Sequence, residues 1–179
     1  MGHTLIAIDP GSNTGWAIYE NGHLFLSGES KRDVAVQEII SHIKGKHVDA
    51  FAIENMYFGA GRSSPRALYM LGFNTGYISG LLEPYLEQDT ERWNPQPGQW
   101  RKVLGIAKGK REEVAVAALQ KAEDIAVQKL EGPRGGKQTD RAMAICIGMA
   151  MLKKEKGDEG EKKGRPKVRK GNKNRKDVS

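Results

Sequence analysis

Three acidic residues stand at the ends of apolar segments: Asp9, Glu54 and Asp140. The first two follow short apolar runs that predict buried strands, and the third precedes an apolar run that predicts a buried helix. If the two strands are parallel neighbours, Asp9 and Glu54 emerge at the same end of the sheet, where open α/β sheets bind ligands. Three ionised carboxylates in one place repel one another unless a hard cation neutralises them, and oxygen ligands suit Mg²⁺ or Mn²⁺. The pattern predicts a metal site, whereas singly Asp9 could brace its turn and Asp140 could serve as a helix N-terminal charge.

The other residue types that carry chemistry predict no competing site. Cys146 is the only cysteine, which excludes a disulfide framework, and its apolar surroundings are typical of a buried position. The histidines lack a paired spacing such as i, i+4, and the chain has no Gly-x-Ser-x-Gly nucleophile motif. No run reaches the ~18 apolar residues of a membrane span, and the N-terminus does not resemble a signal peptide. We therefore expect a soluble protein of a reducing compartment.

The elements that must position the carboxylates alternate between strand and helix patterns. Apolar runs predict three strands joined by turns, at 4–8, 15–19 and 23–27, with a tight Asn21-Gly22 hairpin between the last two. A helix starting at Ser30, with Asp33 as its capping partner, then leads to a strand over 48–53. This order is a crossover, so the fourth strand is expected to lie parallel to an earlier one.

The second half of the chain adds one strand and four helices to the prediction. The strand covers 90–93, and the helices cover Pro65 to about Leu86, 100–104, 111–130 and a segment from Asp140 to Leu152. The expected class is α/β, with a mixed five-stranded sheet flanked by helices. The long helix carries Gly72, Gly76 and Gly80 at four-residue spacing, each of which costs a helix ~1 kcal/mol relative to alanine. Such a row indicates a close packing partner, either the protein's own sheet or a second subunit.

The positive charge of the chain is confined to its C-terminal end. The net charge is +7, but residues 1–150 contain 17 basic and 17 acidic residues, whereas residues 151–179 contain 12 basic and 5 acidic ones. Residues 151–179 contain too few apolar side chains for their burial to compensate for the conformational entropy lost on folding, so we expect this segment to be disordered. It either binds a polyanion, most simply nucleic acid, or is a solvated end that aids solubility.

A set of motifs resembles the RuvC-type Holliday junction resolvases, in particular their phage and prophage branch. The matching segments are IAIDPGSNTG at 6–15, AIE at 52–54, NPQPGQWRKVLG at 94–105, KGK at 108–110 and TDRAMAI at 139–145. The resemblance covers about residues 4–152. It implies an RNase H-like nuclease domain over 1–152, followed by a basic disordered tail over 153–179.

The resemblance implies a function as well as a fold. The function is Mg²⁺-dependent cleavage of four-way DNA junctions by a homodimer, without an organic cofactor or a membrane, in the cytoplasm of a bacterial or phage-infected cell. The acidic residues of the family fall on Asp9, Glu54 and Asp140. We hypothesise two ions per site, with Mn²⁺ able to substitute, Asp9 bridging both ions and the other two carboxylates holding one each. Lys110 or Arg111 would offset the charge that builds on the phosphate.

The resemblance also implies a DNA-contacting set: Tyr57, Phe58, Arg62, Arg101, Lys108, Lys110, Arg111 and Lys137. Tyr57 falls where the family places an aromatic wedge that can stack on an unpaired base, although it could instead cap the sheet. The basic residues could equally belong to solvated helix faces. Lys137 marks a departure, because the family usually carries an Asp or a His there.

Three alternatives to a junction resolvase remain open at the level of the sequence. The same fold and carboxylates serve nucleases that act on flaps, forks or RNA–DNA hybrids. Lys137, in place of a fourth ligand, is compatible with a junction-binding protein that does not cut. An actin-like ATPase half-domain also opens with a strand, an Asp and a Gly-rich hairpin, but it needs a second such domain.

Overall fold

The computed structural model describes residues 2–11, 13–55, 64–132 and 135–162 of the 179-residue chain. The strands are β1 (Thr4–Asp9), β2 (Asn13–Glu20), β3 (His23–Lys31), β4 (Ala50–Ile53) and β5 (Glu91–Trp93). They form one sheet in the order β3-β2-β1-β4-β5. β1, β2 and β3 pair antiparallel, whereas β4 lies parallel to β1 and β5 parallel to β4. The predicted mixed five-stranded sheet, including the parallel crossover, is confirmed.

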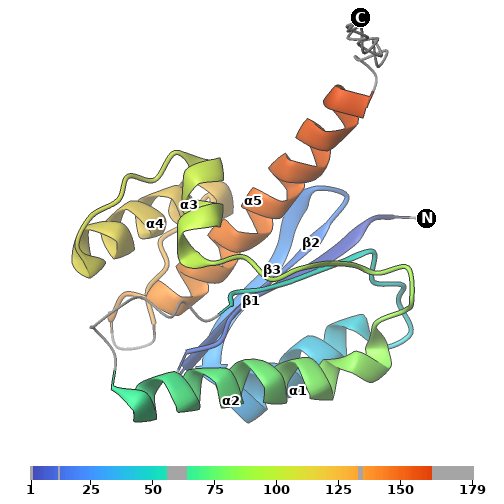
Figure 1. Ribbon diagram of the computed structural model, residues 1–179, viewed down its shortest axis with the longest axis horizontal. Coiled ribbons are helices and arrows are strands. Elements are labelled where there is room, and N and C mark those ends of the chain that lie inside the picture. Colours follow the sequence, from blue (N-terminus) through green and yellow to red (C-terminus); the bar gives the residue numbers. More distant parts are fainter. Residues whose placement is uncertain (1, 12, 56–63, 133–134, 163–179) are drawn as a thin grey trace, which may run out of the picture.

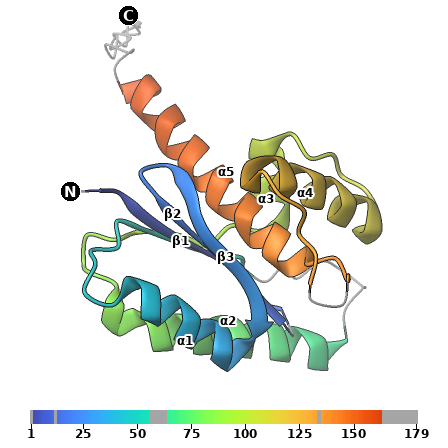
Figure 2. The same ribbon diagram turned by 180° about the vertical axis from the view of Figure 1, so that it is seen from behind.

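Helices cover both faces of this sheet (Figures 1 and 2). One face carries α1 (Arg32–Ile43) and α2 (Pro65–Leu82), which is followed by the short 3₁₀ helix η1 (Glu83–Tyr85). On the other face α5 (Thr139–Lys162) lies across the strands, with α3 (Pro97–Leu104) and α4 (Arg111–Ala126) packed against it. Within the described ranges, no helix is both long enough and apolar enough to cross a membrane.

Several helix boundaries differ from the prediction. α2 ends at Leu82 rather than near Leu86, α3 begins at Pro97 rather than at Trp100, and α4 ends at Ala126 rather than near Leu130.

The differences at α1 and α5 have a clear physical reason. α1 begins at Arg32 rather than at Ser30, because β3 continues to Lys31 and the Ser30 hydroxyl donates to Glu38 at 2.8 Å instead of capping the helix. α5 continues to Lys162, so residues 153–162 are helical rather than part of a disordered tail. Extending an existing helix needs no new nucleus, and Lys and Glu are good helix formers. Residues 163–179 lie outside the described residues.

Two of the three glycines of α2 do not pack on the protein's own sheet. Gly76 and Gly80 are exposed, and a Cβ built on either one would meet none of the described atoms within 4 Å. The same helix exposes large apolar side chains, with Tyr69 at 69% and Phe73 at 44% exposure. The explanation by intramolecular packing is therefore wrong at these two positions.

Among the described glycines, Gly15 has the closest neighbouring atoms. Gly15 of β2 is buried, and a Cβ built on it would overlap the backbone carbonyl oxygen of Asp140. The first turn of α5 therefore rests directly on the backbone of β2, and only glycine leaves room for it. This contact sets the depth at which α5 meets the sheet.

We predict that Gly15→Ala lowers the free energy of unfolding by about 1–3 kcal/mol or more, because the methyl group forces α5 away from β2. Urea denaturation would measure the loss. Gly98→Ala in α3 is the matched control, since a Cβ there meets no described atom within 4 Å. An equally stable Gly15→Ala protein would contradict the close contact.

Candidate active site

Asp9 and Glu54 lie side by side because β1 and β4 are parallel and in register. Ile8 pairs with Ile53, and the next backbone N–H, that of Glu54, donates to the Ile8 carbonyl at 3.0 Å. Side chains alternate between the faces of a sheet. Ile8 and Ile53 pack in the core beneath α1 and α2, so the carboxylates that follow them face α5.

Asp140 approaches this pair from the first turn of α5. A Cβ built on Gly11, in the turn just after Asp9, would lie 3.3 Å from Oδ2 of Asp140. Asp9, Glu54 and Asp140 line one pocket of ≈ 460 Å³, between the sheet and helices α2, α3, α4 and α5. The structure thus brings together the three carboxylates that the sequence analysis singled out, and all three are partly buried.

Glu54 is the carboxylate whose ionisation is most affected by its surroundings. Burial raises its pKa, while a hydrogen bond from Trp100 and the positive charge of Arg101 oppose that rise. Trp100 is itself 1% exposed, and its indole Nε1 donates to Glu54 Oε1 at 2.6 Å. Trp100 lies in one of the matching segments, but no sequence pattern predicts this contact with Glu54.

Asp140 is held in place by a carboxylate that the sequence analysis missed. Glu29 of β3 accepts, through Oε2, the backbone N–H groups of Asp140 at 3.0 Å and of Arg141 at 3.1 Å. The Arg141 side chain continues the attachment to β3, because its Nε donates to the Ser27 hydroxyl at 2.9 Å. The start of α5 is therefore tied to the sheet by both its backbone and a side chain.

The predicted DNA-contacting residues differ in how close they lie to the carboxylate pocket. Arg101 lines both the carboxylate pocket and an adjoining pocket of ≈ 680 Å³, which Lys108 also lines. Lys110 is exposed and directly precedes α4, and Arg111 is the first residue of that helix. Lys110 lines neither of these two pockets, although Gly109 beside it lines the carboxylate pocket. Three more members of the set lie outside the described residues: Tyr57, Phe58 and Arg62.

Lys137 does not line the carboxylate pocket. It is exposed and pairs with Glu131 in an isolated antiparallel bridge before α5. Hydrogen bonds from the Leu130 N–H and from Lys129 lower the pKa of Glu123, and the charge of Lys137 adds to this effect. The lysine at the position of the family's further ligand therefore lies outside the carboxylate pocket, and its charge acts on Glu123.

A second group of ionisable residues lies at the opposite end of the sheet. His47, Glu87 and Asp89 bring possible ligand atoms within 4.8 Å of one another. The absence of a paired histidine spacing did not predict this group, because Glu87 and Asp89 are distant from His47 in the sequence. His47 Nδ1 lies 3.0 Å from Glu87 Oε1, and this hydrogen bond raises the pKa of His47. Ion pairing with a protonated imidazole accounts for the arrangement.

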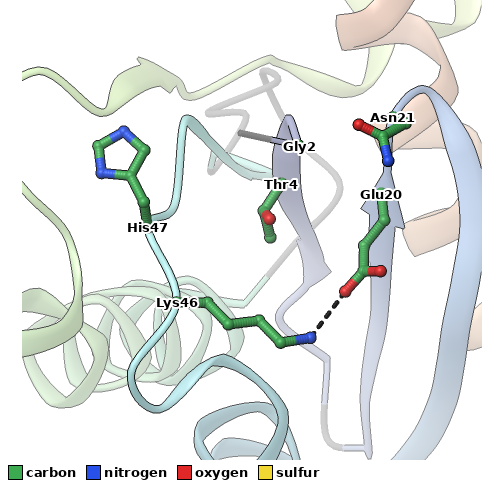
Figure 3. A pocket seen from close by; sticks show the side chains of 6 residues that line it. All are labelled: Gly2, Thr4, Glu20, Asn21, Lys46 and His47. Carbon is green, nitrogen blue, oxygen red and sulfur yellow. Dashed lines mark hydrogen bonds and ion pairs between the residues drawn. The ribbon is translucent and has the colours of Figure 1, made fainter.

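His47 also lines a shallow pocket of ≈ 340 Å³. Figure 3 shows His47 on one side of this pocket and Glu20 and Asn21 on the other, with Lys46 reaching Glu20 at 2.7 Å. The pocket surrounds the start of β1, whereas the carboxylate pocket lies at its end. The two sites are therefore separated by the length of the strand.

Comparison with solved structures reveals close similarity of fold. Thermus thermophilus RuvC in complex with a Holliday junction substrate has a TM-score of 0.59 and 15% sequence identity, covering 87% of this chain and 96% of that chain. The fowlpox virus resolvase, also solved with Holliday junction DNA, has a TM-score of 0.53 and 16% identity, covering 85% and 98%. No protein-family model and no curated protein matches the sequence. The chain therefore has the RNase H-like fold of these resolvases.

The raised pKa of Glu54 leads to a prediction about stability. Because the pKa of Glu54 is higher in the folded than in the unfolded protein, its contribution to the free energy of unfolding is most favourable at low pH, where the carboxyl is protonated. This contribution is lost as the pH rises through the folded-state pKa. Glu54→Gln should therefore raise the melting temperature at neutral pH in EDTA, by about 2–4 °C for each kcal/mol of relief. The difference from wild type should vanish below about pH 4.

Differential scanning calorimetry across this pH range would measure the effect. Glu112→Gln, on the exposed face of α4, is the matched control and should shift the melting temperature little at any pH. A Glu54→Gln protein that melts below wild type at neutral pH would contradict the electrostatic assignment.

Proposed function

We propose that the protein is a metal-dependent endonuclease that cleaves four-way DNA junctions. The observation that carries the proposal is the convergence of Asp9, Glu54 and Asp140 on one pocket. The fold around this pocket is shared with two resolvases that were solved with Holliday junction DNA. Nucleases acting on flaps, forks or RNA–DNA hybrids are the alternatives that a substrate panel distinguishes.

The donor set of the pocket fits a divalent cation. It offers three carboxylates from β1, β4 and α5, and oxygen ligands are those that Mg²⁺ and Mn²⁺ prefer. The raised pKa of Glu54 supports this proposal, because a nearby cation would favour the ionised form that burial disfavours. Asp9, Glu54 and Asp140 would hold Mg²⁺, and we propose two ions per site. Bound cations would activate water and stabilise the leaving oxygen.

The protein's own residues would then orient the phosphodiester. Trp100 fixes Glu54 through its 2.6 Å hydrogen bond, so the carboxylate cannot rotate freely. Arg101 lies between the carboxylate pocket and the adjoining pocket that contains Lys108, which would place positive charge beside a bound strand. Guanidinium and ammonium groups attract phosphates without regard to sequence, as expected for recognition of DNA by its branching.

A homodimer is part of the proposal, because a junction presents two equivalent strands to be cut. The outward face of α2 supports it. Tyr69, Phe73 and Tyr77 stack in succession, with ring centroids 6.4 and 5.8 Å apart, and all three are exposed. Gly76 and Gly80 on the same helix leave room for close approach of a partner helix. We propose that two copies meet through this face.

The function is tested by incubating the protein with a mobile four-way junction or a linear duplex, in Mg²⁺ or EDTA. Paired symmetric nicks on the junction alone, absent in EDTA, are expected. Asp9→Asn should slow cleavage by about 1000-fold or more, because several kcal/mol of charge stabilisation is lost. Junction binding should persist or improve in this variant, since a negative charge near the phosphates is removed.

The matched control is Asp124→Asn, which alters an exposed carboxylate on α4 that accepts a hydrogen bond from Gln120. It should cut at the wild-type rate. Junction binding without cutting by wild type would exclude the nuclease, and cutting of flaps or hybrids as fast as junctions would change the substrate class.

The dimer is tested with Gly76→Leu. The side chain meets open space in the monomer, so the melting temperature should be unchanged or slightly higher, since leucine favours helix over glycine. A close helix–helix contact would be blocked, and the dimer dissociation constant should rise by about 10-fold or more. Sedimentation equilibrium would measure it, with Gly98→Leu on α3 as the control. Wild type that sediments as a monomer at micromolar concentration would contradict the proposal.

A further inference from the structure

Glu29 and Gly15 form a two-point support beneath the first turn of α5. The two residues face each other across the β2–β3 ladder, and Gly15 in turn faces Asp9 across the β1–β2 ladder. Directly opposed residues of antiparallel strands point to the same face of a sheet. Glu29, Gly15 and Asp9 therefore form one row under α5, and Glu54 extends this row on the other side of Asp9.

The two supports constrain the helix in different directions. Gly15 lets the Asp140 carbonyl rest on β2, which sets the height of the first turn above the sheet. Glu29 accepts the N–H groups of Asp140 and Arg141, which draws the same turn towards β3. The N–H groups of the first helical turn usually donate to the side chain of the residue just before the helix. Here the acceptor comes from a strand more than a hundred residues earlier in the chain.

The local sequence does not supply this cap by itself. Gln138, just before the helix, uses its side-chain Oε1 to accept from Arg141 Nη1 at 2.9 Å. Beyond the first turn, α5 is held by its buried residues, among them Ala142, Ile145 and Cys146. Loss of Glu29 would therefore loosen the turn that carries Asp140 while the rest of the helix stays packed.

We propose that Glu29 is a positioning residue, which holds the Asp140 carboxylate in place against Asp9 and Glu54 for divalent-cation binding. This inference rests on the proposed function only in naming the cation and the reaction. Residues that orient metal ligands typically change metal affinity or activity 10- to 100-fold when removed. The hydrogen-bond acceptor at Oε2, rather than the negative charge, is the feature that the geometry requires.

The test compares Glu29→Ala, Glu29→Gln and Glu29→Asp in the full-length protein. Calorimetric titration with Mn²⁺, without DNA, should show affinity about 10- to 100-fold weaker for Glu29→Ala. Glu29→Gln should stay close to wild type, because its amide oxygen still accepts. Glu29→Asp keeps the charge but withdraws the acceptor by one methylene, so it should resemble the alanine variant.

Two further readouts separate positioning from general destabilisation. Junction cleavage in a single turnover should slow along with Mn²⁺ affinity, whereas junction affinity in EDTA should not change. Glu38→Ala is the matched control, since Glu38 Oε2 also accepts two hydrogen bonds, from Trp16 and Ser30. The hydrogen bonds of Glu38 lie on the face of the sheet that carries α1. Glu38→Ala should therefore lower the free energy of unfolding without weakening Mn²⁺ binding.

Each outcome decides the assignment. Unchanged Mn²⁺ affinity in Glu29→Ala, or an equal loss in Glu38→Ala, would overturn it. If Glu29→Ala does not fold, the comparison of Glu29→Asp with Glu29→Gln decides, and equal affinities would overturn it. Wild type that binds Mn²⁺ but does not cut junctions would reject the proposed function while the binding data still test Glu29. Wild type that binds no Mn²⁺ would reject both.

Discussion

The contact between the first turn of α5 and the backbone of β2 governs the rest of the site. A helix normally keeps its distance from a sheet because side chains fill the space between them. At Gly15 no side chain intervenes, so the Asp140 backbone lies directly on the strand. This proximity brings a residue from the last helix to the strand ends that carry Asp9 and Glu54. Without it, three carboxylates from three distant segments would not line one pocket.

Gathering carboxylates in this way opposes folding. Partial burial disfavours ionised Glu54, and the Trp100 hydrogen bond and the Arg101 charge compensate only in part, since the pKa remains raised. A core without these charges would be more stable, so the arrangement is not explained by stability. Groups whose ionisation is perturbed in a cleft are typical of functional sites. The same surroundings that cost stability also hold Glu54 in a defined orientation, which a ligand-binding carboxylate requires.

The sequence allowed prediction of the features that depend on local patterns. Short apolar runs placed Asp9 and Glu54 at strand ends, and the crossover rule predicted the parallel pairing of β1 and β4. Features that depend on distant partners were missed. Serine is a common helix-capping residue, yet the Ser30 hydroxyl donates to Glu38. The reason is that β3 continues beyond the apolar residues from which the strand was predicted. His47 gained acidic neighbours from the segment before β5, which no local spacing reveals.

Glu29 shows most clearly why part of the site could not be predicted. The hairpin at Asn21-Gly22 pairs Glu20 with His23, and continuing that register would place Gly28 opposite Gly15. The ladder instead shifts by one residue between Tyr19 and Ile18, so that Glu29 takes this place. A shift of one residue moves every later side chain to the opposite face. The carboxylate that caps α5 thus reaches the helix only because of an irregularity in the β2–β3 ladder, and the composition of β3 alone gives no sign of it.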